Sequence, residues 1–184
     1  MTRYLALIFL AALAFPTFAQ QPPSHAAERT AAMQKLAPLH GIWRGTAKGN
    51  MRGAAINLTQ TERIGPMLGG DILVIEGRGY KADGELDFNA VAIISYDTKK
   101  DTYQFRSYAN GYAGTYEFRV TDTGYSWEMP ADPGASIRHD IQIKENTWLE
   151  SSYYIKDGAE PLKFLELKLE RVGDTEWPAS GFIK

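Results

Sequence analysis

The segment 54–64 places two polar side chains among apolar ones in a pattern that could support chemistry. Successive side chains on a β-strand point to opposite faces, so residues two apart share a face. Gln60 and Glu62 therefore share a face with Ile56, Leu58 and Ile64. We expect this amide and this carboxyl to lie side by side on the inner, apolar side of a strand.

The carboxyl group of Glu62 is the more informative of the two, because a carboxylate is costly to bury unless it is paired. Its possible partners elsewhere in the chain are Arg78, Arg106 and His139. Such a pair inside a cavity would orient a polar group of a ligand. The alternative is that the strand bulges near "RIGPM", which would turn Glu62 towards solvent.

His139 lies in "SIRHDIQI", where it shares a face with three isoleucines while Arg138 and Asp140 point the other way. An imidazole at such a position could contact a ligand, act as a general base or bind a metal. The alternative is a structural histidine that is hydrogen-bonded to a neighbouring tyrosine or serine. His25 and His40 lie in an N-terminal linker and at the end of the one helical segment, so they add nothing to this site.

Aromatic residues are numerous, with ten Tyr, eight Phe and four Trp, and several share the inner phase of their segments. Aromatic rings with polar tips suit an amphipathic ligand. The side chains expected to line an interior cavity are Tyr103, Tyr116 and Trp127, with Tyr125 beside them. The alternative is that the rings fill the interior completely.

Other kinds of chemistry lack the residues that they need. The chain has no Cys, which excludes thiol catalysis and Cys-ligated metals. No His-x-His or His–Glu pair occurs at ligand spacing, and zinc needs three or four convergent ligands, so we expect no metal. No G-x-S-x-G motif or phosphate-binding glycine loop is present. The net charge of −2 predicts no basic surface for nucleic acid.

Ten short segments of alternating character must position these residues, and turn residues such as Asn110 and Gly111 separate them. The expected strands are 42–49, 54–64, 71–80, 86–96, 102–109, 112–120, 125–129, 135–144, 147–155 and 162–172. No helical crossover separates them, so they should pair antiparallel in chain order. We predict an all-β, antiparallel up-and-down barrel of about ten strands, because closure removes the exposed edges of a meander. A two-sheet sandwich is the alternative.

The N-terminal region is organised differently. Residues 1–19 combine Arg3, an uncharged apolar run and small residues, which is the pattern of a secretory signal peptide. The apolar run is shorter than the roughly 20 residues of a spanning helix. We expect cleavage, a linker at 20–26 and one domain at 27–184, released as a periplasmic or secreted protein without a membrane span. "AERTAAMQKLAPLHG" predicts a short helix that closes one end of the barrel.

The two ends of the domain carry a further combination of residues. Gly41 and Trp43 form a G-x-W motif after the helix, and Arg171 lies near the end of the last strand. With the meander between them, this resembles the calycin group of lipocalins, fatty-acid-binding proteins and nitrobindin-like haem barrels, and is most similar to uncharacterised exported bacterial lipocalin-like domains. The resemblance implies that Trp43 plugs the closed end and that Arg171 packs over it, here through a cation–π contact. The last strand lacks the Arg-x-Tyr clamp of fatty-acid-binding proteins, and no histidine matches the haem ligand of nitrobindin-like barrels.

Three functions are compatible with these residues. The leading one is a binding protein that holds a small amphipathic or aromatic molecule in the barrel lumen and needs no cofactor, with haem as a variant of the ligand. The second is an enzyme of the isomerase, lyase or cyclase type, in which Glu62, His139 and a tyrosine converge as acid and base. The third is an interaction module with a filled core and an exposed apolar patch.

Overall fold

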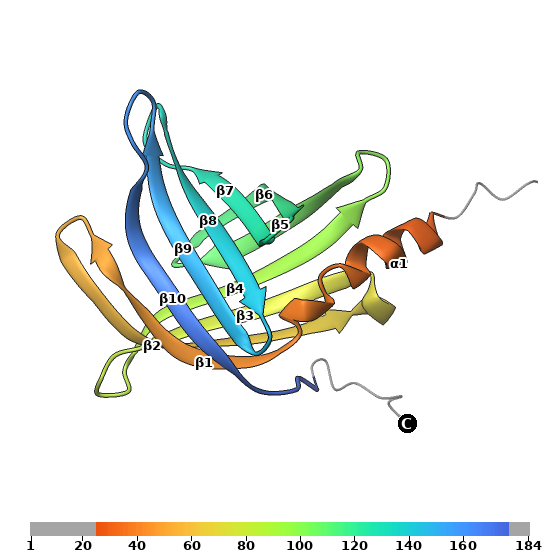
Figure 1. Ribbon diagram of the computed structural model, residues 1–184, viewed down its shortest axis with the longest axis horizontal. Helices are drawn as coiled ribbons and strands as arrows, with labels where there is room; N and C mark the ends of the chain where they lie inside the picture. Colours follow the sequence, from red (N-terminus) through yellow and green to blue (C-terminus); the bar gives the residue numbers. More distant parts are fainter. Residues whose placement is uncertain (1–24, 177–184) are drawn as a thin grey trace, which may run out of the picture.

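The computed structural model describes residues 25–176, so the predicted signal peptide at 1–19 lies outside the described residues. A helix, α1 (Ala26–Gln34), and a 3-10 turn, η1 (Ala37–Leu39), come first (Figure 1). The strands that follow are β1 (Gly41–Met51), β2 (Ala54–Met67), β3 (Ile72–Tyr80), β4 (Leu86–Asp97), β5 (Thr102–Ala109), β6 (Tyr112–Thr121), β7 (Gly124–Pro130), β8 (Ala135–Lys144), β9 (Thr147–Lys156) and β10 (Leu162–Gly173).

The strands form one closed barrel in which each pairs antiparallel with its neighbours in chain order, and β1 pairs with β10 to complete the circle. This confirms the predicted ten-stranded up-and-down barrel with a short N-terminal helix, and it excludes the sandwich. The hairpin turns contain the glycines that tight connections need, such as Gly111 at φ 82°.

Strand β2 is longer than the sequence predicted, because it continues through Gly65 and Pro66 to Met67. The pairing with β1 ends at Ile64, so the last three residues of β2 pair with β3 alone. Proline is tolerated in a strand where one edge is free, since its missing N–H then costs no ladder hydrogen bond. The turn is therefore confined to the 3-10 segment η2 (Leu68–Gly70).

The register of β2 against β3 is continuous from Thr59 to Met67. The bulge considered near "RIGPM" is absent from this pairing, so Glu62 keeps the same inward phase as Gln60. Register shifts lie elsewhere in the wall, for example between Ile42 and Trp43 where β1 meets β10.

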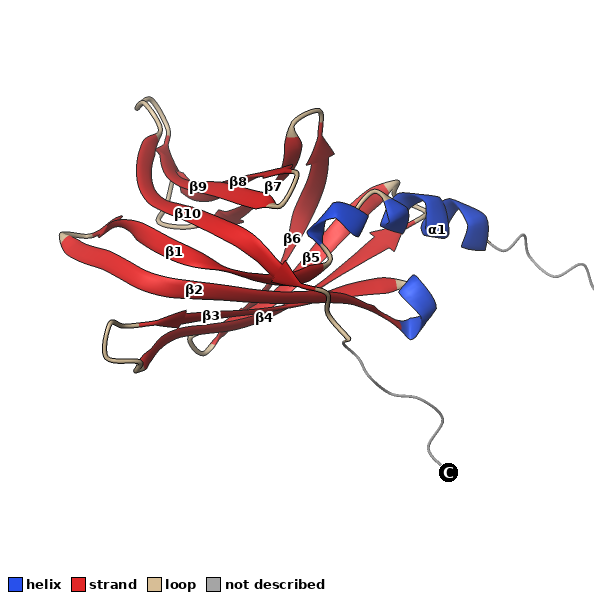
Figure 2. Cartoon of the chain, turned by 60° about the horizontal axis from the view of Figure 1, so that its bottom comes forward, coloured by secondary structure: helices blue, strands red, loops and turns tan. Residues whose placement is uncertain are grey.

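The helix α1 covers one end of the barrel, opposite the β1–β2 and β3–β4 turns (Figures 1 and 2). Met33, Leu36 and Leu39 are buried there. Two tyrosines hold the helix from the barrel wall: the Tyr103 hydroxyl donates to the carbonyl oxygen of Ala32 at 2.7 Å, and the Tyr125 hydroxyl donates to that of Lys35 at 3.0 Å. The predicted closure by the helix thus has a direct hydrogen-bonding basis.

Trp43 lies directly beneath this cover and is fully buried. Its indole N–H donates to the carbonyl oxygen of Leu39 at 2.9 Å, and its ring meets Trp148 edge to face at 5.7 Å between centroids. The position of Trp43 is that of a plug at the closed end, because the indole fills the barrel between η1 and the strand wall.

The expected cation–π contact of Arg171 with Trp43 was wrong. The two residues are paired across β1 and β10, but the Arg171 Nε donates to the carbonyl oxygen of His40 at 3.3 Å, and the guanidinium also pairs with Asp174. A Cβ at position 41 would be 2.8 Å from that Nε, so the Arg171 side chain packs directly against the backbone of Gly41. Arg171 therefore binds backbone at the barrel end, and the one guanidinium over a ring in the described chain is that of Arg138, above Tyr153.

Candidate functional site

The barrel contains a cavity of about 1040 Å³. The predicted site residues on its lining are Gln60, Glu62, Tyr116, Trp127 and His139. Most of the remaining lining is apolar and comes from strands all round the barrel, with Leu39 at the helical end. The side chains therefore do not fill the interior. The third function considered from sequence, an interaction module, assumed a filled core, and the structure does not have one.

Gln60 and Glu62 lie side by side on β2, as their spacing predicted. The Gln60 Nε2 donates to Glu62 Oε1 at 2.7 Å, and only 3% and 8% of the two residues is exposed. Strand β3 makes room for both groups with glycines. A Cβ at Gly77 would be 2.8 Å from Glu62 Oε2, and one at Gly79 would be 3.0 Å from Gln60 Oε1. The two glycines thus form a shallow recess that accepts the polar pair.

Burial raises the pKa of Glu62 from its usual value to about 8, and the nearby carboxylates of Glu150 and Glu76 raise it further, while the hydrogen bond from Gln60 opposes them. Glu62 is therefore a neutral carboxylic acid at pH 7. In that form it can donate one hydrogen bond as well as accept others.

The arginine partners expected for Glu62 were wrong. Arg78 pairs with Glu76, and Arg106 donates to Ser95 at 3.1 Å, both among exposed side chains. The reason is strand phase: Gly77 and Gly79 face the lumen on β3, so Arg78 between them points outwards. The protein compensates the buried carboxyl with a neutral amide and with protonation rather than with a cation.

His139 on β8 is held by two groups of β9. Its Nδ1 lies 2.9 Å from Ser152 Oγ and 3.2 Å from Glu150 Oε1. The other carboxylate oxygen of Glu150 accepts the indole N–H of Trp148 at 3.2 Å. His139 therefore combines both interpretations made from sequence, because it is bonded to a serine and also lines the cavity.

Glu150 and Ser152 were missed by the sequence analysis. In "TWLESSYYIK" both strand phases mix apolar and polar residues, so alternation does not show which face is inside. The signal that could have found them is the preceding Trp148, a large aromatic two residues before Glu150 on the same face.

Trp127 organises the aromatic part of the lining. Its indole stacks on the His139 ring at 4.0 Å between centroids with an angle of 6°, and on Phe105 at 4.5 Å. Tyr116 packs beside it at 5.7 Å. Tyr103, in contrast, is absent from the cavity lining: it lies at the closed end, where its hydroxyl binds α1. The structure therefore places Tyr103 apart from the other residues that were predicted to contact a ligand.

No group of three or more potential metal-ligating side chains occurs among residues 25–176. A haem in the lumen would find one imidazole there, that of His139. Its Nδ1 is engaged by Ser152 and Glu150, so Nε2 is the nitrogen that could bind the iron.

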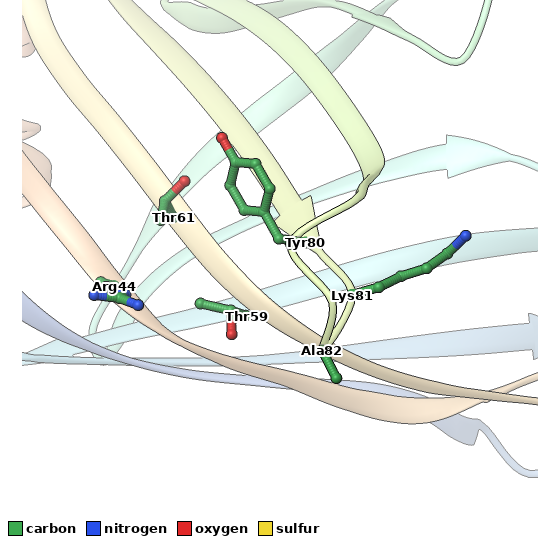
Figure 3. A pocket seen from close by; sticks show the side chains of 7 residues that line it. Arg44, Thr59, Thr61, Tyr80, Lys81 and Ala82 are labelled. Atoms are coloured by element: carbon green, nitrogen blue, oxygen red, sulfur yellow. The ribbon is translucent and has the colours of Figure 1, made fainter.

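A second, open pocket of about 460 Å³ lies on the outer wall of β1 to β3 (Figure 3). Arg44 and Lys81 line it, but they extend in different directions in Figure 3, and the Lys81 ammonium is paired with Glu85 and Asp87. The lumen is the better candidate, because it is larger and its polar groups are buried and converge.

These features define the class of fold: a ten-stranded antiparallel up-and-down barrel with one end closed and a polar cluster within an apolar lumen. A solved structure with a similar fold is that of Rv2717c from M. tuberculosis, which matches with a TM-score of 0.58 over 76% of this chain and 96% of that chain. The two sequences are 15% identical, so the likeness concerns the fold.

No family model matches the chain, and no curated protein matches it. None of the helices in the described part of the chain is long and apolar enough to cross a membrane.

Proposed function

We propose that this protein binds a small amphipathic or aromatic molecule in the barrel lumen. The observation that carries the proposal is the cavity of about 1040 Å³, whose wall is mainly apolar and is joined by two neighbouring sets of buried or partly buried polar groups. One set is Gln60 with Glu62, and the other is His139 with Glu150 and Ser152. A few placed polar groups in an apolar cavity orient a ligand that has one polar end.

The size of the cavity supports the same conclusion. Ligand sites in proteins generally measure about 300–1,000 Å³, so this lumen has room for a molecule of lipid size. Aromatic side chains that line it, such as Trp127 and Tyr116, offer flat apolar contact surfaces.

The test uses the full-length protein purified without detergent. N-phenyl-1-naphthylamine, an uncharged probe that fluoresces in apolar surroundings, should show a saturable one-to-one rise in fluorescence. Native mass spectrometry and organic extraction should recover co-purified small molecules that compete with the probe. A fluorescence titration without saturation, together with an empty extract, would contradict lumen binding.

A second candidate function is acid–base catalysis in the same lumen. The observation that favours it is that Glu62, an acid with a pKa of about 8, and His139 line one cavity. Its test is incubation of the extracted material with fresh protein: a catalyst converts it to a product of changed mass or retention time, and Glu62→Gln slows that conversion. Unchanged material after prolonged incubation would leave binding alone.

We also propose that the protein acts outside the cytoplasm, which the signal-like composition of residues 1–19 supports. Expression of the full chain in a bacterium, followed by fractionation and intact-mass measurement, provides the test. Recovery of a species shortened by about 19 residues in the periplasm or medium is expected. An uncleaved chain retained in the cytoplasm would contradict export.

A further inference from the structure

We infer that the lumen selects amphiphiles whose polar end is a protonated amine over those whose polar end is a carboxylate. This inference rests on the proposed binding function and names the class of ligand. It stands on two carboxyl groups of the cavity lining, the buried Glu62 and the partly buried Glu150, which lie close to each other inside the barrel, while the lysine and arginine side chains of the described lining lie away from them.

The two carboxyl groups come from different parts of the wall, Glu62 from β2 and Glu150 from β9. Both line the cavity, and the charge of Glu150 acts on Glu62. They lie towards the closed end, because Glu62 is paired with Trp43 across β1, and Glu150 accepts a hydrogen bond from Trp148, which contacts Trp43. The polar end of a ligand that enters from the opposite end would meet these groups last.

The lysine and arginine side chains of the described lining lie elsewhere, so the one basic side chain of that lining beside the carboxyl groups is the His139 imidazole, which is bonded to Glu150. The arginine is Arg52, in the β1–β2 turn, and the lysine is Lys81, directly after β3, so both are at the open end of the barrel. The Lys81 ammonium lies 2.9 Å from Glu85 and 3.3 Å from Asp87. A carboxylate ligand would therefore find no lysine or arginine on the described lining at the deep end, where it would be repelled by Glu150.

The Glu62 carboxyl has an oxygen available for a ligand. Its Oε1 accepts the hydrogen bond from Gln60, whereas Oε2 accepts no hydrogen bond from residues 25–176, and Glu62 lies on the cavity lining. An ammonium group has three N–H donors and no acceptor, so it complements such an oxygen. The ring of Trp148 also lines the cavity, and indole faces attract cations.

Binding of the amine should release a proton. The groups around the Glu62 carboxyl are Gln60 on its own strand, Glu76 on β3 and Glu150 on β9, and both carboxylates favour the protonated form of Glu62. The His139 imidazole is bonded to Glu150 on the same lining. An ammonium placed beside Glu62 favours its carboxylate form, so the acid proton passes to solvent as the ion pair forms.

The experiment compares decylamine, decanol and decanoate as competitors of N-phenyl-1-naphthylamine at pH 7, below the concentrations at which they form micelles. The three share one chain length and differ in the polar end. We expect decylamine to bind at least about tenfold more tightly than decanoate, with decanol between them. Equal displacement by decylamine and decanoate would overturn the inference and leave lumen binding intact, whereas failure of the probe itself to bind would overturn the proposed function.

Two further measurements assign the effect to Glu62. Calorimetry of decylamine binding in two buffers of different ionisation enthalpy should show proton release by the wild-type protein. Glu62→Gln should abolish that release and weaken decylamine binding about tenfold while leaving decanol unchanged. The matched control is Glu117→Gln, which removes an exposed carboxylate of β6 that pairs with Arg119, and it should retain both properties. If Glu62→Gln fails to fold, the wild-type calorimetry decides alone, and an absence of proton release counts against the inference.

Discussion

The backbone of Gly77 lies against the carboxyl group of Glu62, its partner across β2 and β3: a Cβ at position 77 would be 2.8 Å from Oε2 and 2.9 Å from Oε1. The glycine therefore sets where the carboxyl group can sit. Because both residues face the lumen, this contact connects the packing of the wall with the chemistry of the cavity.

Gly77→Ala should displace the Glu62 carboxyl from its recess and disturb its hydrogen bond with Gln60. We expect the free energy of unfolding to fall by about 1–3 kcal/mol, the usual cost of an added methyl group in a packed interior. Urea denaturation measures it. Gly173→Ala is the control, because a Cβ there would meet no atom within 4 Å.

A double-mutant cycle tests whether the carboxyl is responsible. In a Glu62→Ala background, Gly77→Ala should cost much less than in the wild-type protein, because the atoms that it meets are gone. Equal costs in both backgrounds would mean that the added methyl group acts on the backbone of β2 instead.

The free energy of unfolding should depend on pH in the way that a carboxyl group with a raised pKa, here Glu62, produces. Its pKa rises from 4.5 in the unfolded chain to about 8 in the folded protein, so the folded state binds the extra proton between these values. This contribution to stability is complete below pH 4.5 and is lost as the pH rises to about 8, on the order of 5 kcal/mol in all. Urea denaturation from pH 4.5 to 9 measures it.

Glu62→Gln should remove that part of the pH dependence, so that the variant gains stability relative to the wild-type protein as the pH rises. Glu85→Gln, at an exposed turn position, provides the control and should follow the wild-type curve closely. Parallel curves for Glu62→Gln and the wild-type protein would show that Glu62 titrates normally.

The fold could be predicted from sequence because its signals are local and repeated. Alternation identified the strands, Asn-Gly and Asp-Gly pairs marked turns, and the absence of crossovers fixed the antiparallel order. The same alternation correctly predicted that Gln60 and Glu62 face the interior, because that prediction needs only the sequence of their own strand. The last residues of β2 were predicted to form a turn because glycine and proline, here Gly65 and Pro66, usually indicate one. They extend the strand instead because β1 no longer pairs with β2 beyond Ile64, so the proline occupies an unpaired edge.

Partnerships across the barrel could not be predicted in this way. The arginines proposed for Glu62 lie in the outward phase, and its true neighbours depend on which residues of β3 and β9 come opposite it when the barrel closes. Tyr103 shows a related limit: phase predicts that it faces inwards, but its height along the barrel decides that it contacts α1 rather than the cavity. Register and height are properties of the assembled sheet.

The hydrogen bonds of Tyr103 and Tyr125 to α1 should control the closed end. Burial raises the pKa of Tyr125 to about 12, so its hydroxyl remains a donor at neutral and moderately alkaline pH. The double variant Tyr103→Phe, Tyr125→Phe should lose about 1 kcal/mol for each hydrogen bond. Hydrogen exchange should accelerate in 26–39 more than in the strands.

Tyr112→Phe is the control for that measurement, since 81% of this residue is exposed at the other end of the barrel. A uniform increase of exchange throughout the barrel in the double variant would show that the tyrosines support global stability and do not anchor the helix specifically.

Filling the lumen should separate binding from folding. Ala92 on β4 is 5% exposed and lines the cavity, so a phenyl ring at this position has free space before it. Ala92→Phe should weaken binding of N-phenyl-1-naphthylamine about tenfold or more by occupying its volume, while the free energy of unfolding falls by less than the roughly 1–3 kcal/mol that a larger side chain costs in a packed core. Ala113→Phe adds the same ring at an exposed position of β6 and should bind the probe normally. If the two variants bind equally well, the probe occupies the outer wall rather than the lumen.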